Sequence, residues 1–414
     1  MKTSPIGIGL LGLLICFFIA ACAGDDAGLS LEERAARLHA EALTVDTHCD
    51  TPMAMIGEGF DIGIRHAPGP RAPKIDLPKM IEGGLDAEFF AAFVGQGDRT
   101  PEGYARARRR AEAAIAAVHK MCEDYPDMVG LALTPDDACR LEKEGRRAAF
   151  IGMENGYPIG RDLGLVEEYF NQGVRYITLC HSSDNDICDS STERREPDDN
   201  GLSEFGKQVV AECNRLGILV DVSHASDGSF RDILKATAAP VIASHSSTRA
   251  LCDHPRNLSD DMLLALRENG GVIQVCFVSS FVKTEPPNPE RDQALAALQR
   301  KYGSNREDMD EETRKKAREE YMAVYENYPR AQATLRDLVD HIDHIVQLIG
   351  IDHVGIGTDF DGGGGVEGCD DVSEMPNVTR ELLRRGYSDQ DIHKIWGGNF
   401  MRVFRRVIEV ADTL

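Results

Sequence analysis

A histidine and an aspartate that stand two residues apart, His48 and Asp50, follow a short apolar run near the N-terminus. Side chains of a strand alternate between its two faces, so residues two apart point to the same side. An imidazole and a carboxylate that converge in this way suit a divalent metal such as zinc. One such pair is not specific, because a structural His–Asp hydrogen bond gives the same pattern.

Three further metal-ligating residues, Glu154, His224 and His245, follow apolar runs elsewhere in the chain. Each histidine alone is consistent with a hydrogen-bonded core residue. Together with His48 and Asp50 they make five ligands, more than one catalytic zinc uses, because such a site keeps one position open. Five ligands suit two metal ions bridged by a carboxylate and a water. The sequence therefore predicts two Zn²⁺ per chain, with Glu154 as the bridge.

Proton transfer needs a further residue. A water that bridges two cations loses a proton near neutral pH, and the resulting hydroxide attacks a carbonyl carbon. Asp359 follows another apolar run, and we expect it to take this proton and return it to the leaving amine. Asp361 lies on the same face by its two-residue spacing and is the alternative.

Two more residues have a predicted role at the substrate. His181 ends the fourth apolar run, and its ring can polarise a carbonyl or stabilise an oxyanion. A core or helix-capping role is the alternative for His181. Arg256 follows the sixth run, where a guanidinium can hold a substrate carboxylate by two parallel hydrogen bonds. A surface salt bridge is the alternative for Arg256.

The elements that must position these residues alternate along the chain. Short β-branched runs are separated by Ala-, Leu- and Glu-rich segments of helical periodicity, such as Ala105–Asp124, Glu204–Leu216 and Asp260–Glu268. This alternation predicts an α/β fold of parallel βαβ units. Eight units predict a closed (β/α)8 TIM barrel with its site at the C-terminal ends of the strands. An open doubly wound sheet is the alternative, but its glycine-rich dinucleotide fingerprint is absent. The expected strands are Leu43–Asp46, Ala87–Val94, Ala148–Met153, Tyr176–Cys180, Ile218–Val222, Pro240–Ala243, Gly271–Val278 and Val354–Gly357.

One segment, from about Lys283 to Arg336, breaks this alternation because it is long, charged and helical in pattern. It falls between the seventh and eighth expected strands, on the side of a barrel that carries the active site. We therefore expect one barrel domain over residues 22–414 with a helical insertion around 283–336. The insertion is either a lid, a partner surface or an inert surface segment.

The N-terminus has the pattern of a signal peptide. Lys2 precedes an apolar run from Ile6 to Ala21, which ends in the small residues Ala20 and Ala21 before Cys22. This ending resembles the bacterial lipobox, in which the cysteine is acylated and becomes the first residue. We expect a lipoprotein signal peptide over residues 1–21, a lipid on Cys22, and an outer-membrane location facing the periplasm. An uncleaved N-terminal anchor is the alternative.

The formal net charge of −23 argues against one class of partner. An acidic surface repels phosphate backbones, so we expect no nucleic acid partner. The simplest consequence of this charge is solubility.

Seven segments that contain these residues resemble, in order and spacing, those of the membrane dipeptidases. This family, also called the renal dipeptidases, belongs to the metal-dependent amidohydrolase superfamily. The seven segments span about 315 residues and as a set are highly specific. They are Val45–Asp50, Gly152–Gly156, Thr178–Ser182, Asp221–His224, Ala243–Ser247, Arg256-Asn257 and His353–Gly362.

The resemblance implies a role for each predicted site residue. His48 and Asp50 would bind the first zinc, His224 and His245 the second, and Glu154 both. His181, Arg256 and Asp359 would contact the substrate, with Arg256 on the C-terminal carboxylate of a dipeptide and Asp359 as the proton shuttle. The family often accepts a D-residue at the C-terminal position and is often dimeric, so a homodimer is also expected.

The predicted function is therefore hydrolysis of L-Xaa-L-Xaa or L-Xaa-D-Xaa dipeptides by a metal-bridging hydroxide. A different two-metal amidohydrolase, such as a lactonase or an amidase, is one alternative. Lactonases and phosphotriesterases of that superfamily bridge their metals with a carboxylated lysine after the fourth strand, where this chain has His181. A lipoprotein that uses the barrel only to bind a ligand is the second alternative.

Overall fold

Nine parallel strands form the centre of the molecule. The computed structural model describes residues 28–69, 72–193, 201–303 and 310–414. Eight strands follow one another around the sheet, each hydrogen-bonded to the next, in the order β1-β2-β4-β5-β6-β7-β8-β9. Each of these eight overlaps one expected run, so the predicted (β/α)8 barrel is confirmed. The strands are β1 Val45–Cys49, β2 Ala87–Phe93, β4 Arg147–Glu154, β5 Val174–Thr178, β6 Leu219–Asp221, β7 Ile242–Ser246, β8 Val272–Val275 and β9 Val354–Ile356.

Two features of the sheet were not predicted. A three-residue strand, β3 (Val129–Leu131), pairs with β4 outside the main order. The barrel closes through the residues after β9, where Asp359 N donates to His48 O at 3.0 Å and Asp50 N donates to Phe360 O at 2.8 Å. This closure places Asp359 directly beside the end of β1, next to His48 and Asp50.

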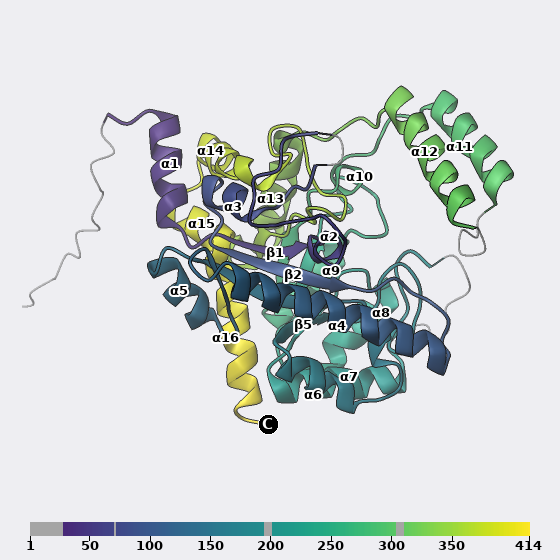
Figure 1. Cartoon of the computed structure of the whole chain (residues 1–414). Coiled ribbons are helices and arrows are strands. Elements are labelled where there is room, and N and C mark those ends of the chain that lie inside the picture. The colour runs from purple at the N-terminus through teal and green to yellow at the C-terminus, as the bar shows by residue number, and fades with distance from the viewer. Residues whose placement is uncertain (1–27, 70–71, 194–200, 304–309) are drawn as a thin grey trace, which may run out of the picture.

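Helices surround the strands (Figure 1). Several coincide with expected segments: α4 spans Pro101–Asp124, α7 spans Glu204–Leu216 and α9 spans Asp260–Asn269. Ser203 and Ser259 cap α7 and α9 by accepting a hydrogen bond from a first-turn N–H, which satisfies a donor that the helix leaves free. The other helices are α1 Leu31–Glu41, α2 Pro52–Met55, α3 Leu77–Glu82, α5 Pro135–Lys143, α6 Gly164–Asn171, α8 Asp227–Ala236, α10 Ser279–Val282, α11 Pro289–Tyr302, α12 Glu311–Asn327, α13 Leu335–Ile349, α14 Pro376–Arg384, α15 Asp389–His393 and α16 Asn399–Ala411.

Apolar side chains fill the barrel interior at the N-terminal ends of the strands. The ring of Phe89 stacks on Phe150 at 4.6 Å between centroids and on Tyr176 at 5.2 Å. Helix α16 adds Phe400 and Phe404, and Phe400 lies edge-on to Phe89 at 5.2 Å. The interior is therefore a packed core, and any site must lie at the opposite end.

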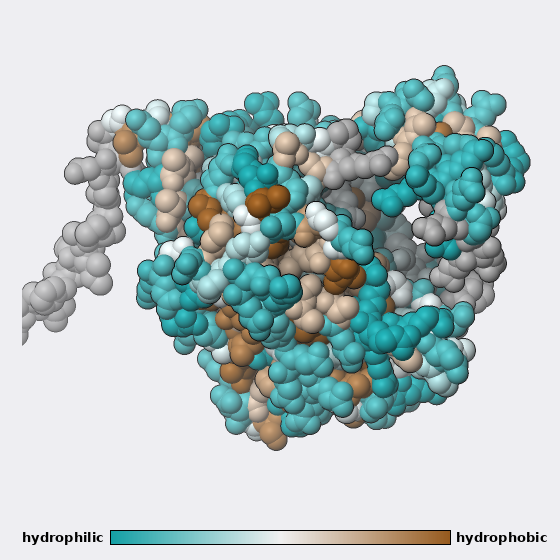
Figure 2. Space-filling model, viewed as in Figure 1, coloured by the Kyte–Doolittle hydropathy of each residue, from teal (hydrophilic) through white to brown (hydrophobic). Residues whose placement is uncertain are grey.

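Helices α11 and α12 lie within the segment expected as an insertion. They pack on each other and project from the barrel (Figure 1), and the face of this hairpin that Figure 2 shows is mostly hydrophilic. At its base, Arg291 Nη2 donates to Glu285 Oε2 at 2.8 Å.

The expected signal peptide and Cys22 fall within residues 1–27, outside the described residues. Among the helices that the structure describes, none combines the length and the apolar character needed to span a bilayer.

Candidate metal centre

Glu154, the last residue of β4, lies at the centre of the predicted ligand set. Its Oε1 is 2.9 Å from His224 Nε2 and 3.5 Å from His245 Nε2, whereas its Oε2 is 3.6 Å from His48 Nε2. Asp50 Oδ2 lies 3.9 Å from the same nitrogen of His48. The structure therefore brings all five residues together, and the two carboxylate oxygens of Glu154 face two different histidine groups.

Several ligand atoms of this cluster are buried and unsatisfied. Across the described part of the chain, no hydrogen-bond partner exists for His48 Nε2, Asp50 Oδ1 or Glu154 Oε2. A buried polar atom left unpaired costs about 1–3 kcal/mol. Nε2 of His224 and Nε2 of His245 also lie only 3.0 Å apart. Cations coordinated by these atoms would satisfy them, so the donor set fits a metal centre.

The backbone is strained around the same cluster. Within the described ranges, the non-glycine residues with left-handed backbone are Asn155 (φ 78°), His224 (φ 70°), Asp359 (φ 59°) and Asp361 (φ 65°). Each follows a strand of the barrel or ends the turn after it. Such residues cost of order 1–3 kcal/mol each and cluster at functional sites. The strain therefore marks the same end of the barrel as the ligands.

Burial controls the electrostatics of the ligands. It raises the pKa of Glu154 well above its usual value, although the charge of His48 opposes this. Burial disfavours protonation of His48, but the carboxylates of Glu154 and Asp50 outweigh it and raise the pKa of this imidazole to about 10. For His224 and His245, burial lowers the pKa well below the usual value. These two rings are therefore neutral, the form that binds a metal.

Asp359 and Asp361 have different environments. Asp359 lines the cavity above the ligands, and burial raises its pKa to about 7, although His48 opposes the shift. Asp361 accepts hydrogen bonds from Thr51 Oγ1 and Lys74 N, both at 2.7 Å. Asp361 therefore anchors the loop after β1, whereas Asp359 borders the cavity.

His181 follows β5 and lies at the edge of the cluster, with its Nε2 3.6 Å from Glu154 Oε1. Its other ring nitrogen lies 2.6 Å from Ser182 Oγ, and Phe93 packs edge-on against the ring at 4.7 Å. Burial lowers the pKa of His181 to about 4, so the ring is neutral. The side chain is partly exposed to the cavity, where it can donate to a substrate oxygen.

Arg256 is buried, which excludes the alternative of a surface salt bridge. Its Nη2 donates to His245 O at 3.0 Å, and its guanidinium carbon lies 5.5 Å from the centroid of the Phe281 ring. Among the residues that the structure describes, no carboxylate lies within 4.0 Å of this guanidinium, and Nε has no partner. A buried cation that borders a cavity without a counter-ion suits an anionic ligand.

The cavity above the cluster has a volume of about 240 Å³. One wall is Gly362, where a Cβ atom would lie 2.0 Å from Asp50 Oδ2 and 2.1 Å from Asp359 Oδ1. Any larger residue at position 362 would collide with these two carboxylates, so glycine is required for both of them to lie beside this wall of the cavity. The lining residues are Asp50, Glu154, His181, Ser182, Thr192, His224, His254, Arg256, Val278, Phe281, Asp359 and Gly362.

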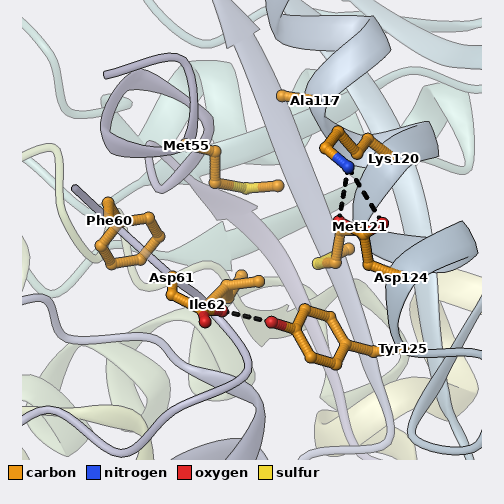
Figure 3. Close-up of a pocket in the computed structure, with 9 residues that line it drawn as sticks. All are labelled: Met55, Phe60, Asp61, Ile62, Ala117, Lys120, Met121, Asp124 and Tyr125. Atoms are coloured by element: carbon orange, nitrogen blue, oxygen red, sulfur yellow. Dashed lines mark hydrogen bonds and ion pairs between the residues drawn. The ribbon is translucent and has the colours of Figure 1, made fainter. Parts of the chain in front are cut away.

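A larger cavity, of about 340 Å³, lies away from this cluster between α2 and α4 (Figure 3). Its apolar side chains include Met55, Phe60 and Met121, and its polar side chains pair with one another, as in the Lys120–Asp124 ion pair at 2.8 Å. None of the nine lining residues is a histidine, so this cavity does not resemble the metal centre.

Sequence reasoning missed the residues that hold the ligands from behind. Tyr176, on β5, places its hydroxyl 2.7 Å from His48 Nδ1. Its ring occupies space left by Gly152, because a Cβ atom there would lie 2.1 Å from the ring. The two residues pair in register between β4 and β5. Gly152, two residues before Glu154, was the one sign in the sequence that a large side chain packs at this point. The sequence does not identify that side chain as Tyr176, because the pairing depends on the register between β4 and β5.

Comparison with known proteins points to one family. The sequence model described as "Membrane dipeptidase (Peptidase family M19)" matches residues 32–414. The chain is 33% identical over 389 residues to Dipeptidase verJ of Clonostachys rogersoniana, covering 91% of this chain and 87% of that protein. It is 32% identical over 345 residues to Dipeptidase tcpJ of Claviceps purpurea, covering 82% and 71%.

A solved structure agrees with these relatives. The crystal structure of the probable dipeptidase PvdM from Pseudomonas aeruginosa superposes with a TM-score of 0.81 at 34% identity, covering 92% of this chain and 99% of that one. The resemblance seen in the seven sequence segments is thus confirmed over nearly the whole described barrel. From the matched length, the shared fold and the dipeptidases among its relatives, we conclude that this chain belongs to the membrane dipeptidase family, peptidase family M19, and is a metallo-dipeptidase.

Proposed function

We propose that the chain hydrolyses L-Xaa-L-Xaa and L-Xaa-D-Xaa dipeptides at a pair of zinc ions. The observation that carries this proposal is the position of Glu154, whose two oxygens face separate histidine groups. His48 and Asp50 would hold one ion, His224 and His245 the other, and Glu154 both. Imidazole and carboxylate ligands of this kind suit zinc. Bound there, the ions would polarise a carbonyl and lower the pKa of water to near neutral.

The side chains around the cavity suggest how a dipeptide is held. Arg256 is a buried guanidinium that forms no ion pair with any carboxylate of the described residues, and a dipeptide has one free carboxylate. Two parallel hydrogen bonds to that carboxylate would fix the C-terminal residue. The neutral ring of His181 would then donate to the carbonyl oxygen of the scissile bond, where negative charge develops.

Asp359 would move the proton. Its pKa of about 7 lets it accept a proton from the attacking water and deliver it to the leaving nitrogen at neutral pH. Its neighbour Cys276 places Sγ 3.9 Å from Asp359 Oδ2, and Asp359 lines the cavity.

The test is a screen of both stereochemical classes of dipeptide with purified protein, before and after removal of metal by a chelator. We expect about two zinc ions per chain, turnover of at least one class, loss of turnover in the chelated sample, and recovery on adding Zn²⁺. A tripeptide such as Ala-Ala-Ala is the control, because its carboxylate cannot reach Arg256 while its first peptide bond is at the metals. Hydrolysis of a lactone but of no dipeptide would favour the other amidohydrolases.

The proposal extends to the location of the protein. The small residues before Cys22 support cleavage after Ala21 and acylation of the cysteine. The mature chain would then sit on the outer membrane facing the periplasm, as a monomer or a homodimer. Labelling with a radioactive fatty acid tests this, since a Cys22→Ala variant should take up no label.

A further inference from the structure

Two candidate ligand histidines, His48 and His245, differ in the hydrogen-bond partners of their Nδ1 atoms, which point away from the metal cluster. The Nδ1 of His48 faces the neutral hydroxyl of Tyr176, at 2.7 Å. The Nδ1 of His245 faces Ser244 Oγ at 2.8 Å, and this hydroxyl in turn lies 2.6 Å from Asp221 Oδ2. His245, Ser244 and Asp221 are all almost fully buried.

Asp221 is placed by the register of three neighbouring strands. It ends β6 and pairs with Thr178 on β5, whose hydroxyl donates to Asp221 Oδ2 at 2.6 Å. Oδ1 accepts from Ser223 N at 3.0 Å and from Ser244 N at 2.8 Å. Four donors converge on this carboxylate, so it serves as an acceptor.

The hydrogen-bond directions follow from this. A carboxylate that accepts from Ser244 takes the only proton of that hydroxyl. Ser244 Oγ can then only accept from His245, so His245 carries its proton on Nδ1. The lone pair of His245 is therefore on Nε2, the atom that lies 3.5 Å from Glu154 Oε1 in the metal cluster.

We propose that Asp221 is a positioning residue for the metal ion at His224 and His245, and that it acts through Ser244. The relay, meaning the hydrogen bonds from His245 through Ser244 to Asp221, fixes the tautomer and the ring orientation of His245. Among the described ligand histidines, His245 alone is linked in this way, through its Nδ1, to a carboxylate. This inference rests on the proposed two-metal function and adds a prediction about one of the two ions. Outer partners of a ligand histidine typically contribute about 10- to 100-fold to metal affinity.

The test compares two variants, each of which removes one hydroxyl group that donates a hydrogen bond to Asp221. Ser244→Ala breaks the relay, whereas Thr178→Val removes an equally short bond to Asp221 that does not lead to a histidine. Zinc affinity is measured by competition with a chromogenic chelator, and anomalous scattering at the zinc edge in crystals shows which position loses occupancy.

We expect Ser244→Ala to lower the affinity for one of the two ions by about 10- to 100-fold and to lower the metal occupancy at the His224–His245 position. Thr178→Val should bind both ions as the parent does, and Ser244→Thr, which keeps the hydroxyl, should too. If Ser244→Ala does not fold, Ser244→Cys, a weaker hydrogen-bonding group, replaces it and should give a smaller loss at the same position.

Equal losses in Ser244→Ala and Thr178→Val would mean that Asp221 only supports the fold, and unchanged affinity in Ser244→Ala would mean that the relay does not act on the metal. Either result overturns the inference while leaving the two-zinc dipeptidase intact. The parent protein distinguishes the remaining case, because failure to bind two ions would overturn the proposed function itself.

Discussion

The hydroxyl of Tyr176 lies 2.7 Å from Nδ1 of His48, in the middle of the barrel interior. The ring of Tyr176 stacks on Phe89, so one residue joins the apolar core to the metal centre. With Nε2 of His48 bound to a metal ion beside Glu154 and Asp50, the ring would carry its proton on Nδ1 and donate it to the tyrosine oxygen. Tyr176 thus fixes the direction in which this imidazole offers its lone pair.

Removing that hydroxyl should weaken the metal centre. Tyr176→Phe should reduce the affinity for one zinc ion by about 10-fold or more, with little change in folding. Tyr169→Phe is the matched control, because Tyr169 is also buried and its hydroxyl has no partner in the described ranges. Chelator competition measures both variants. Equal affinities for the two would show that the Tyr176 hydroxyl does not support the ligand.

Asp359→Asn should separate metal binding from turnover. An amide cannot accept the proton, so kcat should fall at least about 100-fold, while zinc content measured by mass spectrometry stays near that of the parent. Asp361→Asn is the comparison, since it disturbs the loop bonds to Thr51 and Lys74 and should mainly lower stability. Unchanged turnover in Asp359→Asn would assign the proton transfer to another group.

Arg256→Lys should impair recognition of the substrate carboxylate. The variant keeps the charge but loses the two parallel hydrogen bonds of the guanidinium. The KM for a dipeptide should rise about 10- to 150-fold, equivalent to ~1.5–3 kcal/mol for hydrogen bonds to a charged group. Dipeptide amides, which lack the carboxylate, provide the control, because the parent should discriminate against them far more than the variant. Equal discrimination would mean that Arg256 does not contact that carboxylate.

Stability should fall below about pH 6.5 because of His39, on α1. Burial lowers the pKa of His39, so the folded protein keeps the ring neutral while the unfolded chain, with a pKa of about 6.5, takes up a proton. The unfolded state therefore binds more protons as the pH falls. Stability is fully present above pH 6.5 and decreases below it, by at most about 1.4 kcal/mol per pH unit for this one group.

The single tryptophan of the chain, Trp396, reports this change. Trp396 Nε1 donates to Thr379 Oγ1 at 2.7 Å, and that hydroxyl lies 2.8 Å from His39 Nδ1. His39 Nε2 donates to Gly83 O, so Nδ1 accepts from Thr379 and protonation would break this bond. Denaturant unfolding followed by tryptophan fluorescence at several pH values should show a shallower decline in His39→Gln. The same decline in both proteins would contradict the assignment.

The sequence was sufficient to predict the barrel because its strands are separate, apolar and β-branched. Eight runs were enough to specify eight parallel strands, although Leu43–Asp46 ended three residues early because polar residues continue β1 to Cys49. The three residues of β3 are too short to give a periodic pattern. The closing bridge pairs Cys49, the last residue of β1, with Phe360, which lies outside any regular strand, so nothing in the local pattern around Phe360 marks it.

The clustering of the candidate ligands was predictable for a different reason. His48, Glu154, His224 and His245 are polar residues at the ends of apolar runs, and strand ends of a barrel meet at one rim. Ser244, Asp221 and Tyr176 sit on the strands among ordinary neighbours, and their roles depend on hydrogen bonds between strands. Those bonds are set by register, which a single sequence does not reveal.

Phe400 of α16 packs edge-on against Phe89 of β2 in the apolar interior, although more than 300 positions separate the two residues in the chain. Contacts of such long sequence separation form only after much of the backbone has been ordered, and they are associated with slow folding. Partial products of synthesis or proteolysis that lack α16 would expose the rings of Phe89 and Phe150 and would be prone to aggregate. The kinetic vulnerability of this enzyme therefore lies in the apolar interior beneath Tyr176 and the candidate metal centre.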